Sequence, residues 1–269
     1  MRTNSPSAFS AYALFFLVAF LMVAVGGFLQ LLLPLAFSLM LSEVLCVLGP
    51  AMAYQRAFPD MGWAPVFRST PWPIGARPTV LMLTTSILIG LGANVLAALV
   101  VYFMPSLQER QAEYTIVMQQ LLNPPEVWKA MAGAIAITVF APVCEEFLFR
   151  GTLLKVQLQH LPVALAIGLN GLLFGIIHFN EMSLFPLAIV GAFFAWLTWR
   201  SGSVWPAIAS HAALNAVNGV ILPRIIGFDT APDPILTDLL IGIGVLGALA
   251  GSGFVLLRAL MPAAASSER

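Results

Sequence analysis

The sequence predicts an all-α fold, a polytopic membrane helical bundle with about eight transmembrane helices. Its composition is the first reason: 60% of the 269 residues are hydrophobic and only 9% are charged. A soluble domain carries about 25% charged residues, so this chain lacks the charged residues to cover a water-facing surface. The second reason is that apolar stretches of roughly 20 residues, the length of a membrane-spanning helix, recur along the chain.

The predicted spans follow from the positions of these apolar stretches. In chain order they are residues 11–30, 33–54, 79–104, 128–156, 162–179, 184–199, 204–222 and 235–257. The first two are joined only by residues 31–34, which are themselves apolar, so a single long bent helix is the alternative for this region.

Charged residues predict the orientation of the bundle and exclude one class of partner. With both termini inside, nine basic residues lie on the inner side and only Arg110, Lys129 and Arg224 lie outside, as the positive-inside rule requires. The 12 basic and 12 acidic residues balance, so no nucleic-acid partner is predicted. The short chain and minimal loops favour a multi-pass protein of the inner (cytoplasmic) membrane of a prokaryote.

Three smaller features bear on packing. Residues 106–127 are polar and predict a short amphipathic helix on the outer side. Cys46 and Cys144 stand apart in apolar stretches and predict neither a disulfide framework nor a thiolate zinc site. The i, i+4 glycine pairs at 171 and 175 and at 247 and 251 allow helix backbones to approach closely.

Polar residues inside the apolar stretches are the candidates for function. A charged side chain at the bilayer centre costs at least about 2.5–3.5 kcal/mol, so its presence calls for a reason. The positions in question are Glu43, Glu145 with Glu146, Asn170, His178, and His211 with Asn215.

The adjacent glutamates of the fourth stretch have different neighbours. Glu146 and Arg150 are one helical turn apart and can form an ion pair. Glu145 is rotated by about 100° and has no such partner, which makes it a candidate general base. An ion pair that only fixes a helix end would explain Glu146 and Arg150, but it would leave Glu145 unexplained.

The two histidines lie on separate helices and can meet the glutamates. Phe174 and His178 share one helix face, as do His211 and Asn215. The turn near residues 160–162 separates Glu145 from His178, and at ~1.5 Å per residue both lie roughly 20 Å or more from it, at a similar depth. One membrane histidine is as easily a satisfied core residue as a catalytic one. Two beside an unpaired glutamate favour a catalytic site.

These three patterns resemble the motifs of a known family. Glu145-Glu146-x-x-x-Arg150, Phe174-x-x-x-His178 and His211-x-x-x-Asn215 are similar to those of the CPBP family of intramembrane peptidases (CAAX protease and bacteriocin-processing, also called Abi). The resemblance implies three parts: N-terminal membrane helices and loops (1–127), a four-helix peptidase core (128–222), and a C-terminal membrane helix and tail (223–269).

The resemblance also implies a role for each motif residue. Glu145 would be the general base that activates water, assisted by His178, and His211 with Asn215 would stabilise the oxyanion. Glu146, Arg150 and Phe174 would support the site. We expect no cofactor and no metal; in the alternative, zinc-dependent version, Glu145, His178 and His211 would be the ligands.

The implied substrate is a membrane-associated or C-terminally anchored protein or peptide. Relatives act on prenylated CAAX peptides, bacteriocin leaders and exported proteins with sorting tails. The lipid bilayer is the other expected partner. The alternatives are a non-catalytic immunity or scaffold protein of the same family, and a small transporter. A transporter would show repeat symmetry in both halves, whereas the motif residues lie only in the fourth, fifth and seventh stretches.

Overall fold

The computed structural model describes residues 5–59, 75–226 and 236–261, and within these ranges the chain is helical with no β-strand. The predicted all-α polytopic bundle is confirmed. Between the second and third predicted spans, residues 60–74 lie outside the described residues.

The first two predicted spans are two separate helical rods. The first consists of α1 (Ala8–Leu21), the π-helical η1 (Met22–Gly26) and α2 (Gly27–Leu32), and the second of α3 (Leu35–Ser42), the π-helical η2 (Glu43–Leu48) and α4 (Gly49–Ala57). The backbone is extended at Leu33 (φ −125°, ψ 153°) and Pro34 (ψ 142°), and this breaks the helix. Because α1 packs against α4 and η1 against η2, the rods form an antiparallel hairpin and not one bent helix.

The remaining helices follow the predicted order. They are α6 (Ala76–Phe103), the 3₁₀ turn η4 (Pro105–Leu107), α7 (Gln108–Leu122), α8 (Val127–Ile135), the π-helical η5 (Ala136–Phe140), α9 (Ala141–Leu148), the π-helical η6 (Phe149–Leu153), α10 (Leu154–His160), α11 (Val163–Ile177), α12 (Leu184–Ser201), α13 (Trp205–Leu214), the π-helical η7 (Asn215–Ile221), α14 (Leu222–Ile226) and α15 (Leu236–Leu260). The predicted polar helix between residues 106 and 127 is α7.

Each of the eight predicted stretches is a helical segment, and six segments of the described chain are long and apolar enough to cross a membrane. They are Ala8–Leu32, Leu35–Ala57, Ala76–Phe103, Val127–His160, Leu184–Ser201 and Asp238–Leu260. The other two predicted spans fall short of this length and apolarity. Helix α11 has only 15 residues. The rod from α13 to α14 carries the polar His211, Asn215 and Asn218, which lower its hydropathy.

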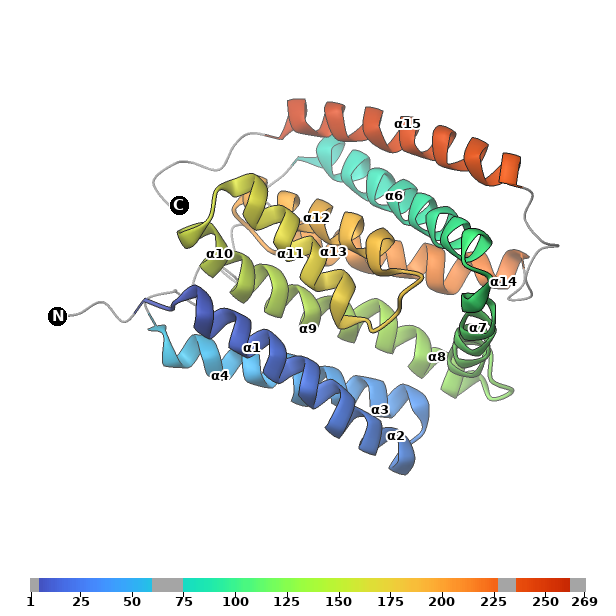
Figure 1. The fold of residues 1–269 in the computed structure, drawn as a ribbon, viewed down its shortest axis with the longest axis horizontal. Helices are drawn as coiled ribbons and strands as arrows, with labels where there is room; N and C mark the ends of the chain where they lie inside the picture. Colours follow the sequence, from blue (N-terminus) through green and yellow to red (C-terminus); the bar gives the residue numbers. More distant parts are fainter. Residues whose placement is uncertain (1–4, 60–74, 227–235, 262–269) are drawn as a thin grey trace.

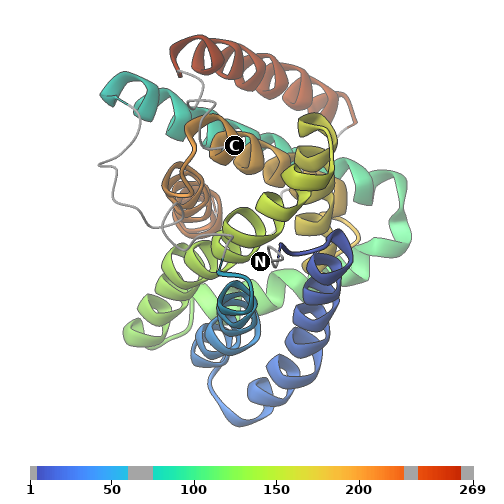
Figure 2. The same ribbon diagram turned by 90° about the vertical axis from the view of Figure 1, so that its left-hand side faces the viewer.

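The helices form layers, with the candidate residues in the middle of the bundle. Helices α6 and α15 pack side by side on one outer side, and the hairpin of α1 to α4 lies on the opposite side (Figure 1). Helices α9, α11, α12 and α13 lie between these two layers, as the view along the bundle also shows (Figure 2). Helices on two sides therefore cover the elements that carry the candidate residues.

Glycines set the spacing between α11 and α12. A Cβ added at Gly171 would lie 2.4 Å from the carbonyl oxygen of Ala188, and one at Gly175 would lie 2.3 Å from that of Leu184. The predicted close approach is therefore confirmed for this pair, and it brings α12 against the helix that carries Phe174. At Gly247 and Gly251 no atom of the described chain lies within 4 Å of such a Cβ, so that second glycine pair marks no close contact.

Candidate active site

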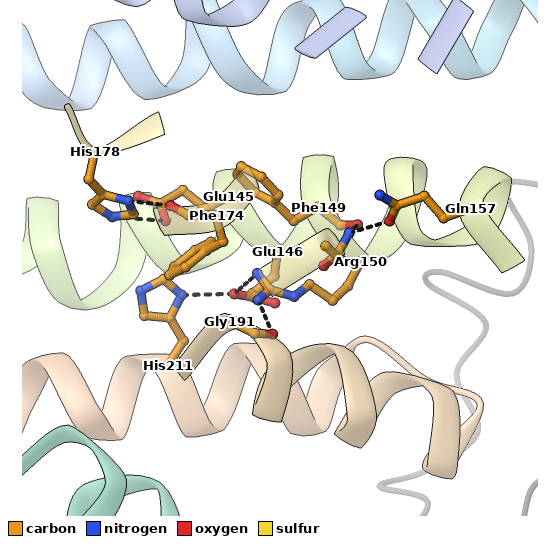
Figure 3. Close-up of polar contacts among 10 residues, drawn as sticks. Glu145, Glu146, Phe149, Arg150, Gln157, Phe174, His178, Gly191 and His211 are labelled. Atoms are coloured by element: carbon orange, nitrogen blue, oxygen red, sulfur yellow. Dashed lines mark hydrogen bonds and ion pairs between the residues drawn. The ribbon is translucent and has the colours of Figure 1, made fainter. Parts of the chain in front are cut away.

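A buried ion pair is the centre of the candidate site. Arg150 Nη1 donates to Glu146 Oε1 at 2.9 Å, and both side chains are 0% exposed. Arg150 Nη2 also donates to the backbone carbonyl of Gly191 at 2.7 Å, which ties η6 to α12 (Figure 3). The predicted i, i+4 pair is thus present. The bond from Arg150 to Gly191 joins its helical rod to α12.

His211 belongs to the same cluster. Its Nδ1 lies 2.9 Å from Glu146 Oε1, the oxygen that also accepts from Arg150 (Figure 3). A carboxylate only accepts, so Nδ1 of His211 carries the proton and donates. The sequence predicted that His211 shares a helix face with Asn215, but not this contact with Glu146, because the contact depends on how α13 crosses α9.

Phe174 packs against both histidines and against the arginine. Its ring centre lies 4.9 Å from that of His178 and 5.6 Å from that of His211, edge to face in both cases. The guanidinium carbon of Arg150 lies 4.6 Å from the same ring centre, a cation–π contact. Phe174, which was predicted to support the site, therefore contacts His178, His211 and Arg150 at once.

Glu145 and His178 meet, as the helix depths predicted. His178 Nε2 lies 3.9 Å from Glu145 Oε2, too far for a direct hydrogen bond. The Nδ1 atom of His178 lies 2.7 Å from the backbone carbonyl of Phe174 (Figure 3). Since a carbonyl only accepts, Nδ1 donates, and the Nε2 of a neutral His178 presents a lone pair toward Glu145. Two acceptors at this separation can bind one water between them.

Asn215 makes a contact of its own. Its Nδ2 donates to the backbone carbonyl of Ile137 at 2.8 Å, which joins η7 to η5. Both segments are π-helical, a geometry that frequently occurs at functional sites. His211 and Asn215 thus engage different partners, and one N–H of the Asn215 amide is committed to the backbone.

A cavity of about 290 Å³ adjoins His178. Arg110, Glu113, Tyr114 and Val117 of α7 form one wall, and the segment from His178 to Met182 forms the other. Phe179, within this segment, has a left-handed backbone (φ 49°), an uncommon conformation for an aromatic residue that recurs at functional sites.

A second, apolar cavity of about 470 Å³ lies next to the first, and Glu181 lines both. The side chains around it belong to the end of α6, the turn after it and the start of α12: Leu99, Val100, Phe103, Met104, Leu107 and Phe185. Arg110 pairs with Glu181 at 3.2 Å, so an exposed ion pair lies where the two cavities adjoin.

The alternative zinc site of Glu145, His178 and His211 does not fit the described residues. These contain no group of three His, Cys, Asp or Glu side chains arranged to hold a metal ion. The two imidazoles instead contact the ring of Phe174, and Glu145 faces only one of them. No step of the chemistry is therefore assigned to a metal.

Glu43 is the residue that sequence reasoning noted but did not connect to the site. It begins η2, it is 7% exposed, and its segment packs against α9, the helix of Glu145. Its apolar surroundings in the sequence were the available signal. The distance along the chain hid the connection, because about 100 residues separate the two glutamates.

Asn170, another noted residue, has a structural role. It is fully buried and donates to the Phe149 carbonyl at 2.9 Å and to Gln157 Oε1 at 3.0 Å. These contacts fix α11 against the rod that carries the two glutamates.

Together, the apolar helices and the buried polar cluster define an integral membrane protein with a polar site inside a helical bundle. Residues 127–217 match the family model described as Type II CAAX prenyl endopeptidase Rce1-like, and this segment contains all three motifs. The resemblance of this segment to the CPBP family of CAAX proteases is thereby confirmed. No curated protein and no solved structure matches the chain.

Proposed function

We propose that the protein is an intramembrane endopeptidase that hydrolyses a peptide bond with a water activated by Glu145. The observation that supports this most is the pair of Glu145 Oε2 and His178 Nε2, 3.9 Å apart. The pair lies within the matched segment, and His178 lines a cavity.

The proposed first step is proton removal from water. The water donates one hydrogen bond to Glu145 and one to the free Nε2 of His178. As its oxygen attacks the carbonyl carbon of the scissile bond, its proton passes to Glu145. The carbonyl oxygen becomes an oxyanion. When the carbon–nitrogen bond breaks, Glu145 returns the proton to the leaving amine, and the carboxylate is restored.

His211 is proposed to stabilise the oxyanion. Its Nδ1–H is committed to Glu146, so it donates to a substrate from Nε2 and must be protonated to do so. A hydrogen-bond donor in a dry site stabilises developing charge strongly. Asn215 is the second proposed donor, through the N–H that Ile137 does not use.

The proposed substrate is a membrane-associated or C-terminally anchored protein. The matched family is named for CAAX prenyl endopeptidases, and the apolar cavity beside the site accepts an apolar part of a substrate. The short loops favour a prokaryotic inner membrane, so an exported or anchored protein is preferred over a prenylated one.

Comparison of peptide termini in membranes tests the proposal. Membranes from cells that express the wild type, Glu145→Gln, or the exposed-site control Glu109→Gln are compared for new termini of membrane proteins. We expect one set of termini in the wild type and the control that is missing in Glu145→Gln. Equal termini in all three, with equal amounts of folded protein, would contradict the proposal and favour a non-catalytic immunity or scaffold protein.

A further inference from the structure

Phe179 has an uncommon backbone conformation for a large side chain. It follows His178, the residue that ends α11, and its φ of 49° lies in the left-handed region. Helices often end with a residue in this region, but that residue is usually glycine, because a Cβ is disfavoured there. The N–H of Phe179 donates to the Ile176 carbonyl at 3.1 Å, a bond that a glycine makes equally well. The backbone therefore gives no reason for a phenylalanine.

Packing within the protein gives no reason either. Phe179 is 58% exposed, and it belongs to none of the buried apolar clusters of the described chain. Phe174 of the same helix, by contrast, is buried and packs against both histidines. The ring of Phe179 instead lines the cavity of about 290 Å³ that adjoins His178.

The opposite wall of this cavity also offers apolar side chains. Tyr114 and Val117 of α7 are three residues apart, so they share a helix face, and both line the cavity. Both are exposed, so each has apolar surface that the protein does not cover. A strip formed by Phe179, Tyr114 and Val117 thus lies beside His178.

Most of the polar side chains in the same lining bind within the protein. Arg110 pairs with Glu181 at 3.2 Å, and Oδ1 of Asn180 accepts from the backbone N–H of Met182 at 3.1 Å. Glu113 is the other acidic residue of this lining. Because covering exposed apolar surface is favourable, the strip gives an apolar group the larger gain on entering the cavity.

We infer that Phe179 is a specificity-determining residue whose ring contacts an apolar side chain of the substrate close to the scissile bond. Tyr114 and Val117 complete this subsite from α7. The inference rests on the proposed function, which places the scissile bond at Glu145 and His178. The subsite is separate from the larger apolar cavity, whose lining includes neither Phe179 nor any residue of α7.

Cleavage kinetics of a peptide provide the test. The peptide spans a cut site found in the membranes of wild-type cells and missing with Glu145→Gln. In further peptides, each apolar residue near the cut bond is replaced by serine, one at a time. The purified full-length enzymes are the wild type, Phe179→Gly, Phe179→Asn, Phe179→Leu and the control Phe20→Ala, which removes an exposed ring of α1. Unfolding temperatures are measured alongside.

Phe179→Gly and Phe179→Asn should raise KM by about 10-fold or more and leave kcat nearly unchanged, because they remove binding that is equal in the ground state and the transition state. Both residues tolerate a positive φ, so the unfolding temperature should not fall. Phe179→Leu should restore most of the wild-type KM, and Phe20→Ala should match the wild type.

One serine peptide should be cleaved less efficiently by the wild type, with no comparable further loss in Phe179→Gly, because the substituted side chain and the ring act on each other. An unchanged KM in folded Phe179→Gly or Phe179→Asn, or no serine peptide coupled to position 179, would overturn the inference and leave the proposed function standing. The proposed function fails differently: Glu145→Gln would then cleave the peptide as well as the wild type, or neither would cleave it, and the inference would fall with it.

Discussion

One oxygen of Glu146 binds both Arg150 and His211, each at 2.9 Å. This oxygen joins η6 and α13 to the helix of the candidate base. It also fixes the orientation of the His211 ring, because only Nδ1–H can donate to it. Glu146 and Glu145 are thus neighbours in sequence with separate contacts: Glu146 binds Arg150 and His211, and Glu145 faces His178 at the cavity.

The first prediction separates the roles of these two glutamates. Glu145→Gln should lower turnover by about 10²–10⁴-fold, the contribution of a general base, and leave the unfolding temperature in detergent unchanged. Glu146→Gln should lower both the turnover and the unfolding temperature, because Arg150 then loses its buried counter-charge. Wild-type turnover by purified Glu145→Gln would contradict the assignment of the base.

The second prediction concerns the buried arginine. Arg150→Met should destabilise the protein by about 3–5 kcal/mol, because Glu146 is left buried without its cation. The double variant Arg150→Met with Glu146→Gln should recover part of this loss, since no unpaired charge remains. Unfolding in denaturant measures both. A double variant less stable than Arg150→Met would show that the uncompensated charge is not the cause.

The third prediction uses the glycines of α11. Gly171→Ala and Gly175→Ala should each destabilise the protein by about 1–3 kcal/mol, because the new methyl group would press on the α12 backbone. Gly168→Ala on the same helix is the matched control, because no described atom lies within 4 Å of its added Cβ. Unfolding temperatures that order these variants differently would contradict the close packing of α11 and α12.

The fourth prediction concerns which side the cavity faces. The charge distribution places α7 outside, so a cysteine at position 113, in the wall of the His178 cavity, should react with a membrane-impermeant thiol reagent added from the outer side. A cysteine at position 159, at the exposed end of α10, should react only from the cytoplasmic side. Each cysteine is introduced singly into a variant that lacks Cys46 and Cys144. The reverse labelling would favour an inner-face peptidase.

The fifth prediction concerns metal. Because the described Glu145, His178 and His211 are not arranged as a metal site, dialysis against a strong chelator should leave turnover unchanged. The control is a zinc peptidase dialysed in parallel. Loss of stoichiometric zinc together with activity, and recovery of both on adding zinc back, would favour the zinc-dependent alternative.

Much of the site could be predicted because local spacing determines it. Glu146 and Arg150 are one turn apart, and the turn near Pro162 brings His178 back to the depth of Glu145. Contacts between distant helices could not be predicted this way. The bond from His211 to Glu146 depends on a crossing angle that one sequence does not reveal. The same holds for the packing of η2, which carries Glu43, against α9, which carries Glu145.

The π-helical segments also limited the prediction. A regular α-helix places residues i and i+4 on one face, and this rule grouped His211 with Asn215. However, η7 begins at Asn215, so the regular α-helical phase ends there. The side chain of Asn215 accordingly reaches Ile137 of η5, whereas that of His211 reaches Glu146.

The shortness of α11 has a consequence for the bilayer. Its 15 residues span about 22 Å, less than the roughly 30 Å of a hydrocarbon core. A lipid layer next to a short helix thins to match it. His178 caps the end of this helix, so a thinned bilayer would bring the aqueous phase closer to the imidazole. A hydrolase consumes one water for each bond it cuts, so under the proposed function a short α11 would shorten the path of that water to the site.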